Sequence, residues 1–292
     1  MQVQEVPKDL EGTHEEFHLS KSRLNRYISC PYSYLLHYKL RITPIRPDTN
    51  LLIGLATHRL IAAHHLAKKK GEFVDPDLLL EDLWSRYTQG VDDTTHQEMK
   101  RAREESLRYA RLFIQDAPID PLEIEYSFSI PLINLTNGDT LPIPLVGIID
   151  LLDQENGTLR PLEIKTRARK ADAWQVQVSL ELTCYAYYVK QETMEDTRET
   201  DTPIPVGYIN IIKTKTPSIQ WQTDYRSLKD FLNLYHTAKA VYENIMDGRF
   251  YLNPGTHCNW CDFPSICRKD KDEIIKTFGD AAYLRLWEED PI

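Results

Sequence analysis

Residues 144–166 read PLVGIIDLLDQENGTLRPLEIKT, and this stretch decides the fold. Two apolar runs, Leu145–Leu152 and Leu159–Ile164, flank the pair Asn156-Gly157. An Asn-Gly pair between two strand-like runs is the strongest short sequence indication of a two-residue β-hairpin turn. We therefore predict two antiparallel strands joined at this turn.

The turn also determines which residues face each other across the hairpin. Counting outward from Asn156 and Gly157 places Asp150 opposite Glu163. Because side chains alternate between the two faces of a strand, Asp150, Glu163 and Lys165 share one face. The other face is apolar and is expected to carry Ile149, Leu151, Leu162 and Ile164.

Two adjacent carboxylates repel each other, so both stay ionised on an apolar hairpin only where a cation compensates their charge. Oxygen ligands suit Mg²⁺ or Mn²⁺, and Mg²⁺ usually completes its shell with waters and substrate phosphate. Lys165 could orient or activate such a water, or stabilise negative charge as phosphorus is attacked. The alternative is a surface hairpin on which Glu163 and Lys165 form an ordinary ion pair.

The composition is that of a soluble globular protein. The 292 residues suffice for one large domain or two, and 41% are hydrophobic and 27% charged. Neither a membrane-spanning run nor a secretory signal is recognisable, so we expect a cytoplasmic protein that does not bind membranes. A net charge of −9 argues against non-specific coating of nucleic acid but allows a local basic groove. The absence of P-loop and GxGxxG sequences leaves an ATP motor or a Rossmann site unsupported.

The rest of the chain shows helical and strand-like patterns on both sides of the hairpin. We expect helices after the N-cap Ser20 and at residues 32–38, 51–70, 77–87, 96–116, 174–190 and 225–247. We expect further strands at residues 122–130, 206–213 and 218–223. The acidic, polar residues 191–205 predict an exposed loop.

The helix expected at residues 51–70 carries His58 on its apolar stripe. This stripe consists of Leu51, Leu55, Ala62 and Leu66. A lone histidine on an apolar helix face is more often a hydrogen-bonded core residue than a metal ligand. The pattern alone therefore favours a core histidine, although we rank His58 above His64 and His65 as a ligand.

Three cysteines near the C-terminal end follow a C-x2-C-x5-C spacing, namely Cys258, Cys261 and Cys267. Three thiols this close together in a cytosolic protein usually bind metal, and tetrahedral zinc or a cubane cluster needs a fourth ligand. Cys30 would complete a Cys₄ set and join the two ends of the chain, with an iron–sulfur cluster as the preferred occupant. Zinc, completed by His257 or Cys30, is the alternative. Cys184 is left as a buried structural thiol.

These motifs together resemble the PD-(D/E)XK nuclease superfamily. Within it they are most similar to RecB-like exonucleases with an iron–sulfur cluster, such as the AddB nuclease domain and CRISPR-associated RecB-like nucleases. The similarity covers nearly the whole chain in the order of the family's motifs. The matching segments are LSKSRLNRYISCPYSYLLHY (19–38), GLATH (54–58), GIID (147–150), EIK (163–165) and the closing cysteines. Each motif alone is weak, whereas the ordered set is specific.

The resemblance implies a restriction-endonuclease-like α/β core, with a central mixed β-sheet flanked by helices. One integrated domain would comprise a helical N-terminal region (1–120), the sheet core (121–224) and a C-terminal helix with the iron–sulfur segment (225–292). The implied ligands of Mg²⁺ or Mn²⁺ are His58, Asp150, Glu163 and the Ile164 carbonyl, with Lys165, Glu163 and Asp150 catalytic. The implied ligands of a [4Fe-4S] cluster are Cys30, Cys258, Cys261 and Cys267.

The implied DNA contacts are Tyr185 and the basic residues Arg167 and Arg169, which follow the hairpin. Glu181 departs from the family, which typically has glutamine four residues before the tyrosine. An extra carboxylate there could weaken phosphate binding or alter strand preference.

The implied activity is metal-dependent exonuclease cleavage of DNA, with a preference for single-stranded or frayed ends. Its context would be recombination and repair, CRISPR adaptation or phage DNA metabolism, with corresponding protein partners, while the oligomeric state stays open. One alternative is a non-catalytic DNA-binding accessory subunit, against which the complete set of His58, Asp150, Glu163 and Lys165 argues. The other is a metal hydrolase acting on something other than nucleic acid, which the basic segment after Glu163 disfavours.

Overall fold

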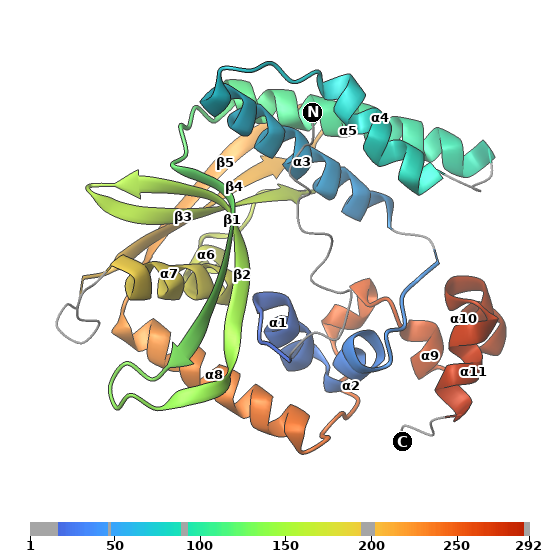
Figure 1. Ribbon diagram of the computed structural model, residues 1–292. Helices are drawn as coiled ribbons and strands as arrows, with labels where there is room; N and C mark the ends of the chain where they lie inside the picture. Colours follow the sequence, from blue (N-terminus) through green and yellow to red (C-terminus); the bar gives the residue numbers. More distant parts are fainter. Residues whose placement is uncertain (1–16, 46–47, 89–92, 194–201, 289–292) are drawn as a thin grey trace.

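The computed structural model describes residues 17–45, 48–88, 93–193 and 202–288, which form an α/β fold around a five-stranded sheet (Figure 1). The strands lie in the order β1-β2-β3-β4-β5, and all neighbours are antiparallel except the parallel pair of β3 and β4. Their bounds are β1 (Glu123–Ile133), β2 (Thr140–Glu155), β3 (Thr158–Arg167), β4 (Ile204–Ile212) and β5 (Ser218–Arg226). The expected central mixed sheet flanked by helices is confirmed.

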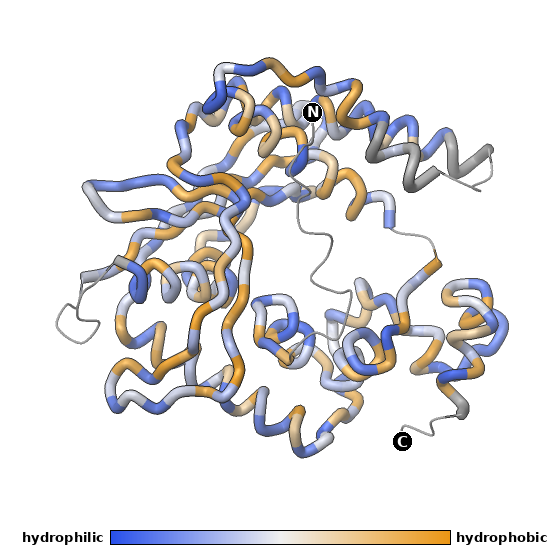
Figure 2. The backbone as a smooth tube through the Cα atoms, viewed as in Figure 1, coloured by the Kyte–Doolittle hydropathy of each residue, from blue (hydrophilic) through white to orange (hydrophobic). Residues whose placement is uncertain are grey.

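Helices cover both faces of this sheet, and hydrophobic residues concentrate along the strands (Figures 1 and 2). One face is covered by α3 (Thr49–Lys70), α4 (Pro76–Thr88) and α5 (Asp93–Asp116). The other is covered by α6 (Ala173–Gln177), α7 (Leu180–Thr193) and α8 (Leu228–Met246). None of the helices within the described ranges is long and apolar enough to span a bilayer.

Helices from the two ends of the chain pack against each other beside the sheet (Figure 1). The N-terminal elements are α1 (Lys21–Ser29), α2 (Pro31–Tyr34) and the π-helix η1 (Leu35–Lys39). The C-terminal elements are η2 (Thr256–Trp260), α9 (Pro264–Cys267), α10 (Lys271–Phe278) and α11 (Asp280–Glu288). Cys30, Leu36 and Ile42 share one apolar cluster with Phe263 and Ile274. This shared core brings together segments more than two hundred residues apart.

The β2–β3 hairpin forms where the Asn-Gly pair predicts it. Asn156 and Gly157 have φ angles of 51° and 84°, the left-handed conformations that a type I′ turn requires. The pairing from Glu155↔Thr158 to Leu151↔Leu162 has the predicted register. Regular pairing ends there, one residue before Asp150 and Glu163, so these two carboxylates lie just beyond the ladder.

The prediction that Ile149 and Leu151 share one face is wrong. Ile149 packs in the core beneath α7 and α8, whereas Leu151 packs against α3 and α5. The pairing of β1 with β2 skips Glu125 and Asp150, and Glu125 has a φ of 48°. A non-glycine residue in this left-handed region is strained, and such strain is typical of functional sites. Strict alternation is therefore lost at Asp150.

The apolar stripe predicted for α3 is not its core face. Leu51, Leu55 and Leu66 are exposed, and of the predicted stripe only Ala62 is buried, together with Leu52 and Leu60, in the core shared with α5. Apolar residues occur nearly all around this part of α3, so their spacing does not identify the buried side. The side that carries Leu51 and Leu55 lines a cleft, as described below.

The helix expected at residues 174–190 is two helices, α6 and α7. Ser179 lies between them, and its Oγ accepts a hydrogen bond from the Leu182 N–H at 3.1 Å. This bond satisfies a backbone N–H in the first turn of α7. α7 continues to Thr193, past the start of the loop expected at residues 191–205. Residues 194–201 of that loop lie outside the described residues.

His65, on α3, makes stability depend on pH. It is 5% exposed, and its two ring nitrogens are buried without a hydrogen-bond partner among the described residues. Burial, with smaller effects of His64 and Lys68 that outweigh Asp120, lowers the pKa of His65 from 6.5 to about 4. The unfolded chain takes up a proton below about pH 6.5 while the folded chain stays neutral, so stability falls from there toward pH 4.

We therefore expect His65→Leu to raise the free energy of unfolding at pH 5 by roughly 1–2 kcal/mol, allowing for partial solvent screening. Urea unfolding at pH 7.5 and pH 5 measures this effect. The wild type should lose stability between the two pH values, and His65→Leu should lose less. His236→Gln, at an exposed position of α8, is the control and should lose as much stability between the two pH values as the wild type. If the free energy of unfolding falls equally between pH 7.5 and pH 5 in the wild type and in His65→Leu, His65 is not the cause of the pH dependence.

Candidate active site

A cleft of about 650 Å³ lies between α1, α3 and the strands β2 and β3. Its α1 side carries Lys21 and Arg23, and its α3 side carries Gly54 and His58. Asp150, Glu163, Ile164, Lys165 and Tyr185 also line it. Residues predicted from separate motifs therefore meet in one cavity, which is the candidate active site.

Asp150 is held by groups from both α3 and β3. Its Oδ2 accepts a hydrogen bond from the Ile164 N–H at 2.8 Å and lies 3.4 Å from His58 Nδ1. Burial raises the pKa of Asp150, but His58 and the Ile164 N–H outweigh this effect, so the net pKa is lowered. Burial lowers the pKa of His58, but the Asp150 carboxylate outweighs it, so the net pKa is raised. The surrounding protein groups thus favour an ionised Asp150 beside a protonated His58.

Glu163 is a buried carboxylate with three side-chain partners. It is 3% exposed, and its Oε1 accepts hydrogen bonds from Lys165 Nζ at 2.5 Å and Lys21 Nζ at 3.3 Å. The Tyr185 hydroxyl donates to Oε2 at 3.1 Å. Two ammonium groups and one hydroxyl therefore compensate for the burial of this charge.

Glu181, left as a question by the sequence, also belongs to the site. It is 6% exposed, and its Oε2 lies 2.9 Å from Lys165 Nζ and accepts from the Tyr208 hydroxyl at 3.3 Å. Lys21 Nζ also contacts the Glu181 carboxylate. The four side chains of Lys21, Glu163, Lys165 and Glu181 form a closed arrangement of alternating charges, which we call the charge ring. Sequence reasoning missed Lys21, for which the unbalanced charge of Glu181 was the only available indication.

The residues predicted to contact DNA have different surroundings. Tyr185 is 1% exposed, and its hydroxyl is committed to Glu163. The Arg167 guanidinium donates to Asn210 Oδ1 at 2.6 Å and to Gln175 Oε1 at 3.3 Å, so it is fixed within the protein. Arg169 is exposed in the segment that follows β3. Of the three, Arg169 is thus the most accessible to a large ligand.

The fold brings the four predicted cluster cysteines into one neighbourhood. Cys30 lies between α1 and α2 within the core shared with the C-terminal helices. Burial and then the nearby Cys261, Cys30 and Cys258 raise the pKa of Cys267 to about 11. The Gly255 N–H donates to Cys258 Sγ and the Phe263 N–H to Cys261 Sγ, both at 3.4 Å. Hydrogen bonds of this kind also surround the sulfurs of iron–sulfur clusters.

Neither the predicted ligands of Mg²⁺ or Mn²⁺ nor the four predicted cluster cysteines form a closed coordination shell in this structure. Within the described ranges, no group of three or more His, Cys, Asp or Glu side chains could hold a metal ion. Asp150 is bound to His58 and Ile164, and Glu163 is bound to two lysines. The donor types still fit: two carboxylates and an imidazole suit Mg²⁺ or Mn²⁺, and four thiols suit a cluster or zinc.

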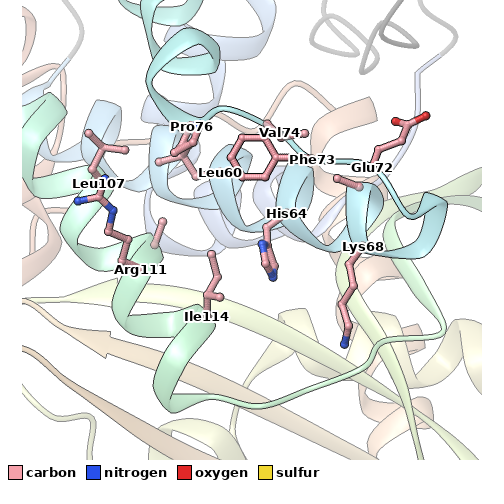
Figure 3. Close-up of a pocket in the computed structure, with 12 residues that line it drawn as sticks. Leu60, His64, Lys68, Glu72, Phe73, Val74, Pro76, Leu107, Arg111 and Ile114 are labelled. Carbon is pink, nitrogen blue, oxygen red and sulfur yellow. The ribbon is translucent and has the colours of Figure 1, made fainter.

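A second cavity, of about 390 Å³, lies between α3, the segment after it and α5 (Figure 3). Leu60, Val74, Leu107 and Ile114 give it apolar walls, and His64, Lys68 and Arg111 add polar groups. It shares no lining residue with the cleft. His64 lines this second cavity and not the cleft, so it does not belong to the candidate active site.

Comparison with known proteins gives one family match. A sequence profile of the PD-(D/E)XK nuclease superfamily matches residues 18–268. No curated protein matches the chain. Among solved structures, SSO0001 is 13% identical with a TM-score of 0.38, over 89% of this chain and 90% of that chain. A candidate exonuclease from Eubacterium rectale is 13% identical with a TM-score of 0.47, over 87% and 88% of the two chains.

Proposed function

Because the chain belongs to the PD-(D/E)XK nuclease superfamily, we propose that it is a metal-dependent DNA exonuclease that prefers single-stranded or frayed ends. One observation carries this proposal: Asp150, Glu163 and Lys165 meet in a single cleft with His58 of α3. Members of the superfamily generally use divalent metal ions such as Mg²⁺. The reaction is hydrolysis of a phosphodiester bond.

His58, Asp150, Glu163 and the Ile164 carbonyl would hold Mg²⁺ or Mn²⁺. When bound, the ion would neutralise charge on the scissile phosphate and lower the pKa of the attacking water. Lys165 would orient that water through its ammonium group and stabilise negative charge as phosphorus is attacked. His58 must lose its proton to ligate, since only the neutral imidazole binds metal.

Other side chains orient the proposed catalytic groups and the DNA. Tyr185 fixes one oxygen of Glu163 and thereby sets the direction of the carboxylate. Arg169 follows Lys165 along the chain, is exposed and would contact phosphates, whereas Arg167 would first have to release Asn210 and Gln175. Trp174, 57% exposed on α6, offers an aromatic surface for an unpaired base. This surface supports the preference for single strands.

Cys30, Cys258, Cys261 and Cys267 would hold a [4Fe-4S] cluster, as the resemblance to RecB-like nucleases implies. The shared core of α2, α9 and α10 supports this assignment because it already joins the two chain ends. The cluster would be structural and would fasten the N-terminal region (1–120) to the C-terminal region (225–292), completing one domain around the sheet core (121–224). Zinc is the competing occupant.

An assay with end-labelled single-stranded DNA and Mn²⁺ tests the proposed function. The wild type should degrade the DNA, and Asp150→Asn should be at least about a hundredfold slower because it loses a metal ligand. Asp153→Asn is the matched control and should remain active, since Asp153 lies three residues further along β2, pairs with Arg160 at 2.6 Å and does not line the cleft.

The same assay separates the competing functions. An accessory subunit would bind the DNA without degrading it, and a hydrolase for another substrate would do neither. A wild type that degrades DNA no faster than Asp150→Asn would rule out the proposed function. The proposed activity fits recombination and repair, CRISPR adaptation and phage DNA metabolism, each with its own protein partners.

A further inference from the structure

Lys21 reaches the candidate active site from α1, although no site motif assigns it a role. Its Nζ lies 3.3 Å from Glu163 Oε1 and contacts Glu181. Lys165 contacts the same two carboxylates, at 2.5 Å and 2.9 Å. Each ammonium group of the charge ring therefore touches both carboxylates, and the formal charges of the four side chains sum to zero.

The backbone holds Lys21 in this position. Leu19 is buried and forms two backbone hydrogen bonds with β2, to the Pro144 carbonyl at 2.9 Å and from the Val146 N–H at 2.8 Å. Ser20 caps α1 by accepting from the Arg23 N–H at 3.3 Å. Lys21 is the first residue of α1, so these contacts fix the point from which its side chain extends.

The charge ring also explains how Glu181 can be buried in a site for an anionic substrate. Without Lys21, the carboxylates of Glu163 and Glu181 would share a single lysine, and their excess charge would repel phosphate. Removing one partner from a buried, hydrogen-bonded ion pair is costly because the other charge is left uncompensated. Lys21 and Glu181 thus carry opposite charges, and each reduces the cost of burying the other.

We propose that Lys21 and Glu181 are a compensating pair of positioning residues for Lys165. Glu181 holds the Lys165 ammonium group with a second carboxylate, and Lys21 cancels the negative charge that this adds beside the phosphate. This inference rests on the proposed nuclease function. It predicts that the two residues can be removed together at much less cost than either alone.

A double-mutant cycle with Lys21→Met, Glu181→Gln and the combined variant tests the pair. Two properties are measured: the turnover of single-stranded DNA with Mn²⁺, as kcat and KM, and the affinity for the same DNA in EDTA. Lys21→Met should weaken DNA affinity and Glu181→Gln should strengthen it, while each lowers kcat by roughly tenfold. The double variant should return both quantities to within about threefold of the wild type.

Two controls separate this role from a structural one. Lys276→Met removes an exposed charge on α10, which pairs with Glu273 at 3.6 Å outside the cleft, and should change neither quantity. Lys21→Arg keeps the charge and should preserve most of the activity. A merely structural role for Lys21 would lower the melting temperature of Lys21→Met and of the double variant alike, without rescue.

Additive effects on kcat in the cycle would overturn the inference. A wild type that does not cut DNA would instead refute the proposed function. The affinities in EDTA would still test the charge compensation, and equal affinities in the wild type, Lys21→Met and Glu181→Gln would overturn the inference independently.

Discussion

Lys165→Met is expected to abolish strand cleavage while DNA binding persists. The Lys165 ammonium group contacts Glu163 and Glu181 in the cleft and is the group proposed to orient the attacking water. Methionine keeps much of the side-chain length but can neither hydrogen-bond the attacking water nor stabilise charge on phosphorus. Loss of such a group lowers the rate of the chemical step by about a hundredfold to ten-thousandfold.

Single-turnover cleavage of end-labelled single-stranded DNA with Mn²⁺ measures this rate. A filter-binding assay with the same DNA in Ca²⁺ shows whether the variant still binds. Lys229→Met, which removes an exposed lysine from α8, is the matched control and should cut at the wild-type rate. Cleavage by Lys165→Met within about threefold of the wild-type rate would remove Lys165 from the proposed chemistry.

Cys30→Ser is expected to lose the bound metal and much of the stability. Of the four proposed cluster ligands, only Cys30 comes from the N-terminal part of the chain. A structural metal site contributes its binding free energy to folding. Its loss would leave the core shared by α2 and α9 without a covalent link between the chain ends. We expect the melting temperature to fall by roughly 10 °C or more.

Metal analysis, colour and thermal unfolding measure the effect of Cys30→Ser. Cys184→Ala is the control, because Cys184 lies on α7 and is buried among apolar side chains, where burial raises the pKa of its thiol to about 12. It should retain wild-type iron. Equal iron content and stability in Cys30→Ser and the wild type would contradict the cluster assignment. A colourless wild type with stoichiometric zinc would replace iron by zinc and leave the nuclease proposal intact.

Local chemistry accounts for what could be predicted from the sequence. The Asn156-Gly157 turn requires left-handed φ angles that these two residues adopt readily, so the hairpin register follows from four residues. The cap at Ser20 and the end of α3 at Gly71, with a φ of 67°, are equally local. The meeting of His58 with Asp150 was predictable only from the resemblance to a family.

Features that depend on packing could not be predicted in this way. The irregularity at Glu125 and Asp150 arises where β1, β2 and α3 meet, and nothing in the local pattern of β2 indicates it. The cleft-facing side of α3 carries Leu51 and Leu55, so periodicity assigns it to the core. Lys21 is an ordinary polar residue of α1 until α7 brings Glu181 against it.

The most direct test of the central claim is a count of Mn²⁺ ions in a complex that cannot turn over. Lys165→Met retains the proposed ligands, so its complex with single-stranded DNA can be titrated with Mn²⁺ and free ion followed by electron paramagnetic resonance. We expect Mn²⁺ to bind this complex and expect the binding to be lost when Glu163→Gln is added. Equal Mn²⁺ binding with and without the Glu163 carboxylate would contradict the claim that Asp150 and Glu163 share the ion that supports cleavage.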